Sequence, residues 1–313
     1  MLTYTNSVTH QIIRIIGVDH GFGNIKTANT CFRAGVVGYE KEPVFAGDVM
    51  FYDHTYFSIG EGHKEFIADK MTDQDYYILT LVAITKELQH ADLRSAQVHL
   101  AVGLPLTWVS EQKEDFRNYL LQQKDPVVTY NDSFYFIHIV DVDVFPQGFA
   151  AIADKLPEFT GATMLCDIGN GTMNIMTVTN GKPNAQKCFT EKYGTQQCVL
   201  AVREQMLRKF GSVIDDDIIE EVLRSGKADI GEKYLAVICE TARQYAAGIM
   251  RRLREHEYNP DLMKLYIVGG GGCLVRNFAE YNADRVTIND DIRATAKGYE
   301  FLANLRLKKA GQK

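Results

Sequence analysis

Short apolar runs alternate with longer amphipathic segments along this chain, which is the pattern of strands followed by helices. Strands are predicted where apolar residues run together or alternate, at residues 14–18, 98–102, 134–144, 164–167 and 265–268. Helices are predicted where apolar residues recur every three or four positions, at residues 73–89, 110–122, 148–156, 196–210, 235–253 and 292–307. Ser110 is the expected N-cap of the second helix, Gly211 ends the fourth, and Asn180-Gly181 indicates a tight hairpin. Residues 1–11 carry no such pattern and are predicted to be a loose extension, and the pattern as a whole indicates an α/β protein.

The composition narrows the possible functions. The chain has 313 residues, of which 46% are hydrophobic and 24% charged, as in an ordinary globular protein. At about 150 residues per domain, this length predicts two domains. Lys and Arg number 34 and Asp and Glu number 40, and the resulting net charge of −6 disfavours general nucleic-acid binding, which needs a basic surface. The apolar runs fall far short of the roughly 20 residues that span a bilayer. We therefore expect a cytoplasmic protein that contacts neither a membrane nor, directly, nucleic acid.

One short motif occurs twice. The stretches Asp19-His20-Gly21-Phe22-Gly23 and Asp167-Ile168-Gly169-Asn170-Gly171 both come at the end of an apolar strand, with glycines two and four positions after the aspartate. Each is followed by a second strand-like run, at residues 25–28 and 174–179. Either copy alone is equally consistent with an ordinary turn, because turns favour Asp and Gly. The pair indicates an internal repeat on the scale of a domain.

The residue types of this motif suit the binding of phosphate. Glycines at the tip of a hairpin let backbone N–H groups approach phosphate oxygens, because no Cβ intervenes. A carboxylate beside phosphate needs a cation between them, and Mg²⁺ binds through few carboxylates together with substrate phosphates. We therefore expect the two hairpins to hold a magnesium nucleotide, with Lys26 neutralising phosphate charge.

Two further features fit a nucleotide site less specifically. Four consecutive glycines, residues 269–272, follow an apolar strand and could let a flat group lie against the backbone, although a flexible loop has the same composition. Glu240 and Arg243 lie three positions apart on the polar face of the helix at 235–253. They could cover a purine or ribose, or they could form an exposed ion pair of about 0.3–0.5 kcal/mol.

The order of these motifs resembles that of the actin-like ATPase superfamily, which includes actin, the heat-shock chaperone ATPases and sugar kinases. The chain has a first phosphate loop at residues 19–26, a connecting helix at 146–150, a second phosphate loop at 167–172 and an adenosine loop at 269–272. Residues 57–61 with the helix that follows, and residues 101–106, are most similar to the ParM/StbA type of plasmid-segregation actin. The resemblance extends over about residues 14–305.

The resemblance implies roles for individual residues. Asp19 and Asp167 would hold Mg²⁺ through water, and Gln147 would orient the attacking water, so these three form the expected catalytic set. The implied nucleotide-binding residues are Gly21, Phe22, Gly23, Asn24, Lys26, Gly169, Asn170, Gly171, Thr172, Glu240, Arg243, Gly269, Gly270 and Gly271. The implied ligands are Mg²⁺ and ATP, with GTP as an alternative to ATP.

The expected fold is therefore the actin-like one, with two related α/β domains of mixed sheet and flanking helices around a nucleotide cleft. Domain I is expected at 12–145 with the C-terminal helix 291–307 and a small inserted subdomain at about 35–72, and domain II at 146–290. The expected function is ATP hydrolysis coupled to head-to-tail filament assembly, driving plasmid or DNA segregation through a DNA-binding adaptor. A small-molecule kinase is the main alternative, and a chaperone-like ATPase and an inactive nucleotide-binding scaffold are weaker ones. A kinase needs a carboxylate base, for which Asp141 and Asp143 are the nearest acids to Gln147 in sequence.

Overall fold

The computed structural model describes residues 1–5, 11–45, 47–61, 71 and 74–310. The chain divides into two compact units, and each is described by itself. The first consists of Met1–Asp154 with Arg293–Lys313, and the second of Lys155–Ile292. Among the described residues, no helix combines the length and the apolar character needed to cross a bilayer.

The first unit is built on one mixed sheet, in which the described strands follow the order β4-β3-β2-β8-β10-β9-β6-β7-β5, with β1 paired to β2. Strands β2, β8 and β10 run parallel at its centre, and the remaining pairs are antiparallel. The strands are β1 (Leu2–Thr5), β2 (Ile12–His20), β3 (Asn24–Lys26), β4 (Cys31–Arg33), β5 (Val36–Tyr39), β6 (Asp48–Tyr52), β7 (Thr55–Ile59), β8 (Ser95–Leu104), β9 (Val127–Tyr130) and β10 (Ser133–Pro146).

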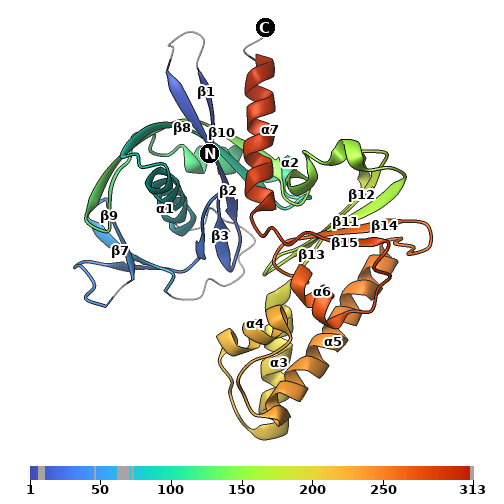
Figure 1. Ribbon diagram of the computed structural model, residues 1–313. Helices are drawn as coiled ribbons and strands as arrows, with labels where there is room; N and C mark the ends of the chain where they lie inside the picture. Colours follow the sequence, from blue (N-terminus) through green and yellow to red (C-terminus); the bar gives the residue numbers. More distant parts are fainter. Residues whose placement is uncertain (6–10, 46, 62–70, 72–73, 311–313) are drawn as a thin grey trace. The chain divides into compact units, whose positions relative to one another are not determined.

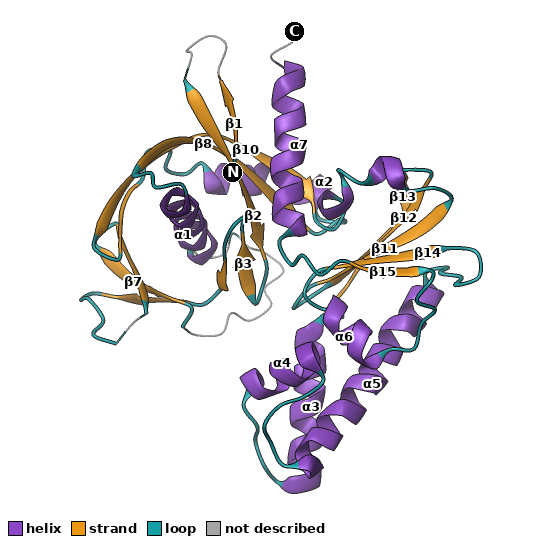
Figure 2. Cartoon of the chain, in the orientation of Figure 1, coloured by secondary structure: helices purple, strands orange, loops and turns teal. Residues whose placement is uncertain are grey.

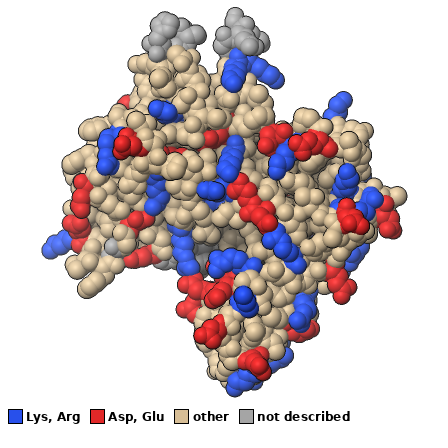
Figure 3. All heavy atoms as spheres, in the orientation of Figure 1, with Lys and Arg blue, Asp and Glu red and all other residues tan. Residues whose placement is uncertain are grey.

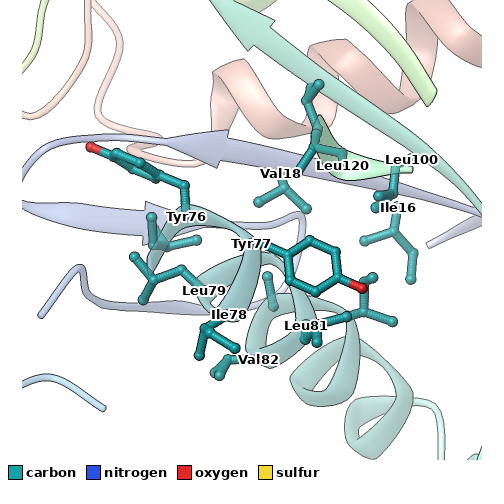
Figure 4. Close-up of a cluster of buried hydrophobic side chains, with 14 of the residues drawn as sticks. Ile16, Val18, Tyr76, Tyr77, Ile78, Leu79, Leu81, Val82, Leu100 and Leu120 are labelled. Carbon is teal, nitrogen blue, oxygen red and sulfur yellow. The ribbon is translucent and has the colours of Figure 1, made fainter. Parts of the chain in front are cut away.

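Helices cover both faces of this sheet. The sheet curves around α1 (Asp75–His90), as Figures 1 and 2 show, and α2 (Val109–Leu120) packs on the same face. Apolar side chains of α1 lie beside Ile16 and Leu100 of the central strands in one buried cluster (Figure 4). The other face carries η1 (Ala150–Ile152) and α7 (Ala294–Ala310). Helix α7 lies directly on the sheet, because a Cβ at Gly17 would come within 2.0 Å of one of its carbonyl oxygens.

The second unit has a smaller mixed sheet in the order β13-β12-β11-β14-β15, with its α-helices packed on one face. Its strands are β11 (Ala162–Ile168), β12 (Met173–Thr179), β13 (Lys182–Glu191), β14 (Lys264–Val268) and β15 (Val286–Ile288). Its helices are η2 (Leu156–Glu158), α3 (Thr195–Phe210), α4 (Asp216–Ser225), α5 (Glu232–Glu255) and α6 (Gly272–Phe278).

The two sheets repeat one topology. Strands β4-β3-β2-β8-β10 and β13-β12-β11-β14-β15 have the same order and the same sense, with two antiparallel pairs followed by two parallel pairs. The repeated Asp-Gly-Gly motif lies at the same place in both, in the hairpins β2–β3 and β11–β12. The prediction of two related domains of mixed sheet with flanking helices is thereby confirmed.

Several local predictions also hold. The helices expected at 73–89, 196–210, 235–253 and 292–307 correspond to α1, α3, α5 and α7 within a few residues. Asn180 and Gly181 have φ angles of 49° and 73°, as a two-residue hairpin turn requires, and Gly211 ends α3 in a left-handed conformation.

Other predictions were wrong. The N-terminal extension contains β1, whose backbone pairs with β2 in an antiparallel ladder that the sequence pattern does not reveal. Ser110 does not cap α2, because this helix begins one residue earlier and Trp108 occupies the cap position. The helix expected at 148–156 is only the short turn η1, and helices α4 and α6 were not predicted.

The boundaries of the two units and of the expected inserted subdomain also differ from those predicted. The first unit continues to Asp154, since η1 packs against α7, whereas domain II was expected to begin at 146. Strands β5, β6 and β7 of the expected inserted subdomain extend the large sheet through the pair β6–β9. Residues 46, 62–70 and 72 of that expected subdomain lie outside the described residues.

Candidate functional site

The first hairpin brings three of the predicted site residues together. Asp19 near the end of β2 lies directly opposite Lys26 of β3, and the Lys26 Nζ atom is 3.3 Å from Asp19 Oδ2. The side-chain amide of Gln147 donates to Asp19 Oδ1 at 3.4 Å. Asp19 is 7% and Gln147 8% exposed, so this carboxylate is held by a cation and an amide in a nearly buried position.

Gln147 reaches this position from a turn and not from a helix. Its backbone N–H donates to the carbonyl of Leu104 at 2.8 Å, which fixes it to the end of β8. The next residue, Gly148, has a φ of 74°, which favours glycine, and η1 begins only at Ala150. The expectation that Gln147 opens a connecting helix is therefore wrong, although its side chain lies beside Asp19.

The tip of the first hairpin needs glycine. A Cβ on Gly21 would lie 2.5 Å from the carbonyl oxygen of Asn24. The carbonyl of Gly23 accepts from the backbone N–H of Ala34 at 3.1 Å, and Asn24 is exposed. The Phe22 side chain is buried in the first unit, so a nucleotide contact at Phe22 would have to use its backbone.

The second hairpin has the same form in the second unit. Asp167, 9% exposed, lies near the end of β11, opposite Asn174 of β12. The backbone N–H of Gly169 donates to the carbonyl of Thr172 at 2.9 Å and closes the turn, with Gly171 and Thr172 both buried.

The start of α3 holds this second loop. The backbone N–H groups of Thr195 and Gln196 donate to the carbonyls of Gly169 and Asn170 at 3.0 and 2.9 Å. A Cβ on Gly194 would lie 2.2 Å from the Asn170 oxygen, so this close approach requires glycine. The first turn of a helix has free N–H groups, and here they fix the carbonyl side of the loop.

The glycine run after β14 lies against the second hairpin. Gly269 has a φ of 85°, and a Cβ there would lie 2.5 Å from Asp167 Oδ1. The N–H of Gly271 donates to the carbonyl of Ile168 at 2.9 Å, and a Cβ on Gly271 would lie 2.2 Å from the Ile168 side chain. Gly270 is exposed, and a Cβ there would meet nothing within 4 Å. The structure thus joins two predicted elements that are a hundred residues apart in the chain.

Glu240 and Arg243 lie on the exposed face of α5. Arg243 Nη1 is 3.2 Å from Glu240 Oε2, and the amide of Gln244 donates to Glu240 Oε1 at 2.9 Å. More than half of each charged side chain is exposed. Helix α5 packs against α6, which begins in the glycine run, but the contacts that hold these two side chains are with one another and with Gln244.

A cysteine thiol lies beside the first hairpin, and another lies beside the glycine run. Cys31 lies opposite Lys26 in the pair β3–β4, and burial raises the pKa of its thiol, against the opposing effect of the Lys26 charge. The Cys273 thiol is 3.0 Å from the carbonyl of Gly270, and burial raises its pKa as well. Within the described part of the chain, no three His, Cys, Asp or Glu side chains form a metal-binding group.

The sequence did not indicate the side chains that support the second loop. The Tyr245 hydroxyl of α5 donates to the carbonyl of Gly194 at 2.7 Å, and the Tyr193 ring stacks on Tyr245 with centroids 4.3 Å apart. A Cβ on Gly248 would lie 2.4 Å from the Tyr193 hydroxyl oxygen. These contacts join separate segments, so no local spacing could have identified them.

Comparisons with known proteins agree on the superfamily in both halves of the chain. The family model for the N-terminal domain of actin-like proteins matches residues 17–149. The model for the C-terminal domain of the archaeal MreB-like actin homologue matches residues 165–280. A search of curated protein sequences finds no significant match.

Solved structures resemble this chain over most of its length. The archaeal actin homologue Ta0583 in complex with ADP is 20% identical, with a TM-score of 0.74, covering 94% of this chain and 100% of that one. A 15-stranded ParM filament from Clostridium botulinum is 16% identical, with a TM-score of 0.74 and coverage of 94% and 99%. The apo pSK41 ParM protein is 15% identical, with a TM-score of 0.69 and coverage of 95% and 98%.

The two models of actin-like proteins match consecutive parts of the chain and together span most of it. The chain belongs to the actin-like ATPase superfamily and has its fold, as its sequence motifs predicted. Its structural relatives include ParM proteins and an archaeal actin homologue.

Proposed function

We propose that this protein binds a magnesium nucleoside triphosphate, ATP or GTP, through its two Asp-Gly-Gly hairpins. The observation that carries the proposal is the group formed by Asp19, Lys26 and Gln147 at the turn of the first hairpin. A glycine-containing turn gives phosphate access to backbone N–H groups, and a lysine there offsets phosphate charge. Asp167, packed against the glycine run, supplies the equivalent carboxylate from the second unit.

The donor set suits Mg²⁺. This ion keeps several of its waters and is bound by one or two carboxylates together with substrate phosphates. One carboxylate in each hairpin, 7% exposed at Asp19 and 9% at Asp167, fits that requirement. When bound, the ion would neutralise charge that develops on the phosphate oxygens during transfer.

We further propose that the bound triphosphate is hydrolysed and that Gln147 positions the attacking water. A neutral amide removes no proton, so its contribution is orientation. Its backbone bond to Leu104 and its side-chain bond to Asp19 restrain Gln147 at both ends.

We propose that nucleotide binding drives head-to-tail assembly in the cytoplasm. Support comes from the structural relatives, which include filaments of ParM and of Alp12. Head-to-tail contacts that do not close into a ring generate helical filaments. The net charge is −6, and both signs alternate over the face shown in Figure 3, so we assign any role in plasmid segregation to a DNA-binding adaptor.

The kinase alternative has less support. Its candidate bases are already engaged, since Asp143 accepts from His99 at 3.1 Å and from Arg306, and Asp141 accepts from Arg117 at 2.5 Å. A general base must be available to accept the proton of a substrate hydroxyl, and both carboxylates already accept from other side chains.

Nucleotide binding is tested by isothermal titration calorimetry, in which the protein is titrated with ATP and with GTP in the presence of Mg²⁺. Lys26→Ala and Asp167→Ala are each expected to weaken binding at least about tenfold, or 1.4 kcal/mol. Lys187→Ala is the matched control, because Lys187 pairs with Glu257 at 2.6 Å elsewhere in the second unit. Equal affinity for all four proteins would refute the proposed site.

Assembly and turnover are tested together by sedimentation and phosphate release with Mg²⁺ and nucleotide at tens of micromolar protein. Polymer in triphosphate and its loss on hydrolysis are expected, and Gln147→Ala should slow phosphate release without preventing sedimentation. Monomers in every nucleotide and salt condition would refute assembly, while leaving nucleotide binding to the calorimetric test.

A further inference from the structure

Helix α1 carries a buried acid that the proposed site does not use. The buried face of this helix is otherwise dominated by apolar and aromatic side chains, yet Glu87 is 0% exposed near its C-terminal end. Removing a carboxylate from water is costly unless hydrogen bonds compensate it. The partners of Glu87 therefore indicate what the acid is there to hold.

Within the described part of the chain, the partners of this carboxylate all belong to one turn, residues 27–30. The Thr27 hydroxyl and the backbone N–H of Asn29, the latter at 3.0 Å, donate to Glu87 Oε1. The Asn29 side-chain amide donates to Glu87 Oε2 at 2.8 Å. The turn is also closed on itself, because the N–H of Thr30 donates to the Thr27 hydroxyl oxygen at 2.9 Å.

This turn begins at the residue after Lys26. The hairpin β3–β4 consists of two three-residue strands at the end of the large sheet, and so short an edge hairpin has few ladder hydrogen bonds of its own. Arg293 fixes the turn from another side, since its guanidinium donates to the Asn29 carbonyl at 3.2 Å. The position of Lys26 relative to Asp19 thus depends on a turn that Glu87 anchors.

We propose that Glu87 is a positioning residue of the phosphate site, holding the 27–30 turn so that the Lys26 ammonium group faces Asp19 and the bound phosphates. The proposal rests on the proposed nucleotide binding and assigns to a remote helix a part in it. A purely structural clamp would stabilise the same turn but would have no specific effect on binding through Lys26.

The first variant is Glu87→Gln, which keeps the size of the side chain. Its amide would set N–H groups against those of the Asn29 amide, a pairing of donor with donor. ATP affinity is expected to fall about tenfold, as measured by calorimetry with Mg-ATP. Adding Asn29→Asp reverses the hydrogen bond, because the amide at position 87 then donates to the carboxylate at position 29. The double variant is expected to recover most of the lost affinity.

The decisive measurement is a double-mutant cycle with Lys26. If Glu87 acts through Lys26, then Glu87→Gln lowers ATP affinity much less in a Lys26→Ala background than in the unmodified protein. An equal factor in both backgrounds would overturn the proposal, as would the absence of any effect of Glu87→Gln on affinity despite a lowered Tm.

Asp143→Asn is the matched control, because it also removes charge from a buried carboxylate of the first unit that accepts from two side chains. It is expected to lower the Tm with ATP affinity unchanged, and a tenfold loss of affinity there would likewise overturn the proposal. If the unmodified protein binds no nucleotide, the proposed function fails first. If it binds nucleotide and the cycle is additive, only the role of Glu87 fails.

Discussion

Replacing Glu300 by glutamine should make the protein more stable at neutral pH. Glu300 lies in α7 and is only 4% exposed, and its carboxylate accepts from the backbone N–H of Gly17 at 3.2 Å. Burial raises the pKa of Glu300 to about 7, and the nearby charge of Glu87 adds to this. The Met1 ammonium group, 3.7 Å away, and the Gly17 bond oppose the shift but do not outweigh burial.

The direction of the effect follows from proton linkage. Between pH 4.5 and 7 the folded protein holds a proton that the unfolded chain has released, so the stabilising effect is complete below 4.5 and is lost as the pH rises through 7. The difference between a pKa of about 7 and the ordinary 4.5 corresponds to about 3 kcal/mol, at 1.36 kcal/mol per pH unit. Glutamine is neutral throughout, so Glu300→Gln does not suffer this loss.

The assay is urea unfolding of both proteins at intervals between pH 4.5 and 7.5. The difference in unfolding free energy should move in favour of Glu300→Gln by about 3 kcal/mol over that range, mostly between pH 5 and 7. Subtracting the two profiles removes the contribution of the titrating groups that do not interact with Glu300. A difference that is constant with pH would refute the argument.

Three further predictions concern the glycine run after β14 and the packing of α7 on the large sheet. Gly269→Ala forces a side chain into a left-handed conformation against Asp167, so it should cost at least about 1 kcal/mol of stability and weaken nucleotide binding, as measured by thermal unfolding and calorimetry, whereas Gly270→Ala, with open space around its Cβ, should leave the Tm unchanged. Mg-ATP should slow alkylation of Cys273, whose thiol lies beside Gly270, and an unchanged rate in the presence of saturating nucleotide would count against the adenosine role of the glycine run. Gly103→Ala places a Cβ 1.9 Å from a tyrosine hydroxyl of α7 and should destabilise the first unit by about 1–3 kcal/mol, as measured by the Tm, without affecting the second unit.

The parts of the fold that could be predicted from the sequence are those decided within a short segment. Helix α5 shows its apolar periodicity over twenty-four residues, and the turn at Asn180-Gly181 is specified by two. Strand β1 depends on its pairing with β2, and the seven residues of α6 start in a glycine run, so neither has a local pattern. The cap was predicted at Ser110 and lies at Trp108, because the end of a helix can shift by one or two residues without changing the apolar pattern.

The same distinction applies to the candidate site. The two hairpins repeat one local motif, and this is why the sequence alone was enough to find both. The groups that hold the two hairpins in place come from distant segments of the chain, and they differ in chemistry between the two units. The buried Glu87 carboxylate of α1 anchors the hairpin that carries Lys26, whereas backbone N–H groups at the start of α3 hold the loop after Asp167.

The unlike anchors also bear on what the repeated loops do. If the Asp-Gly-Gly motif only terminated strands, then the turn alone would suffice, and neither unit would need a buried carboxylate or a helix start to restrain it. Instead, Glu87 holds the turn at the far end of the strand that follows the first loop, and the start of α3 holds the second loop directly. Restraint of this kind is expected where a loop must keep its backbone preorganised for a charged ligand, because reorganising it on binding would reduce affinity.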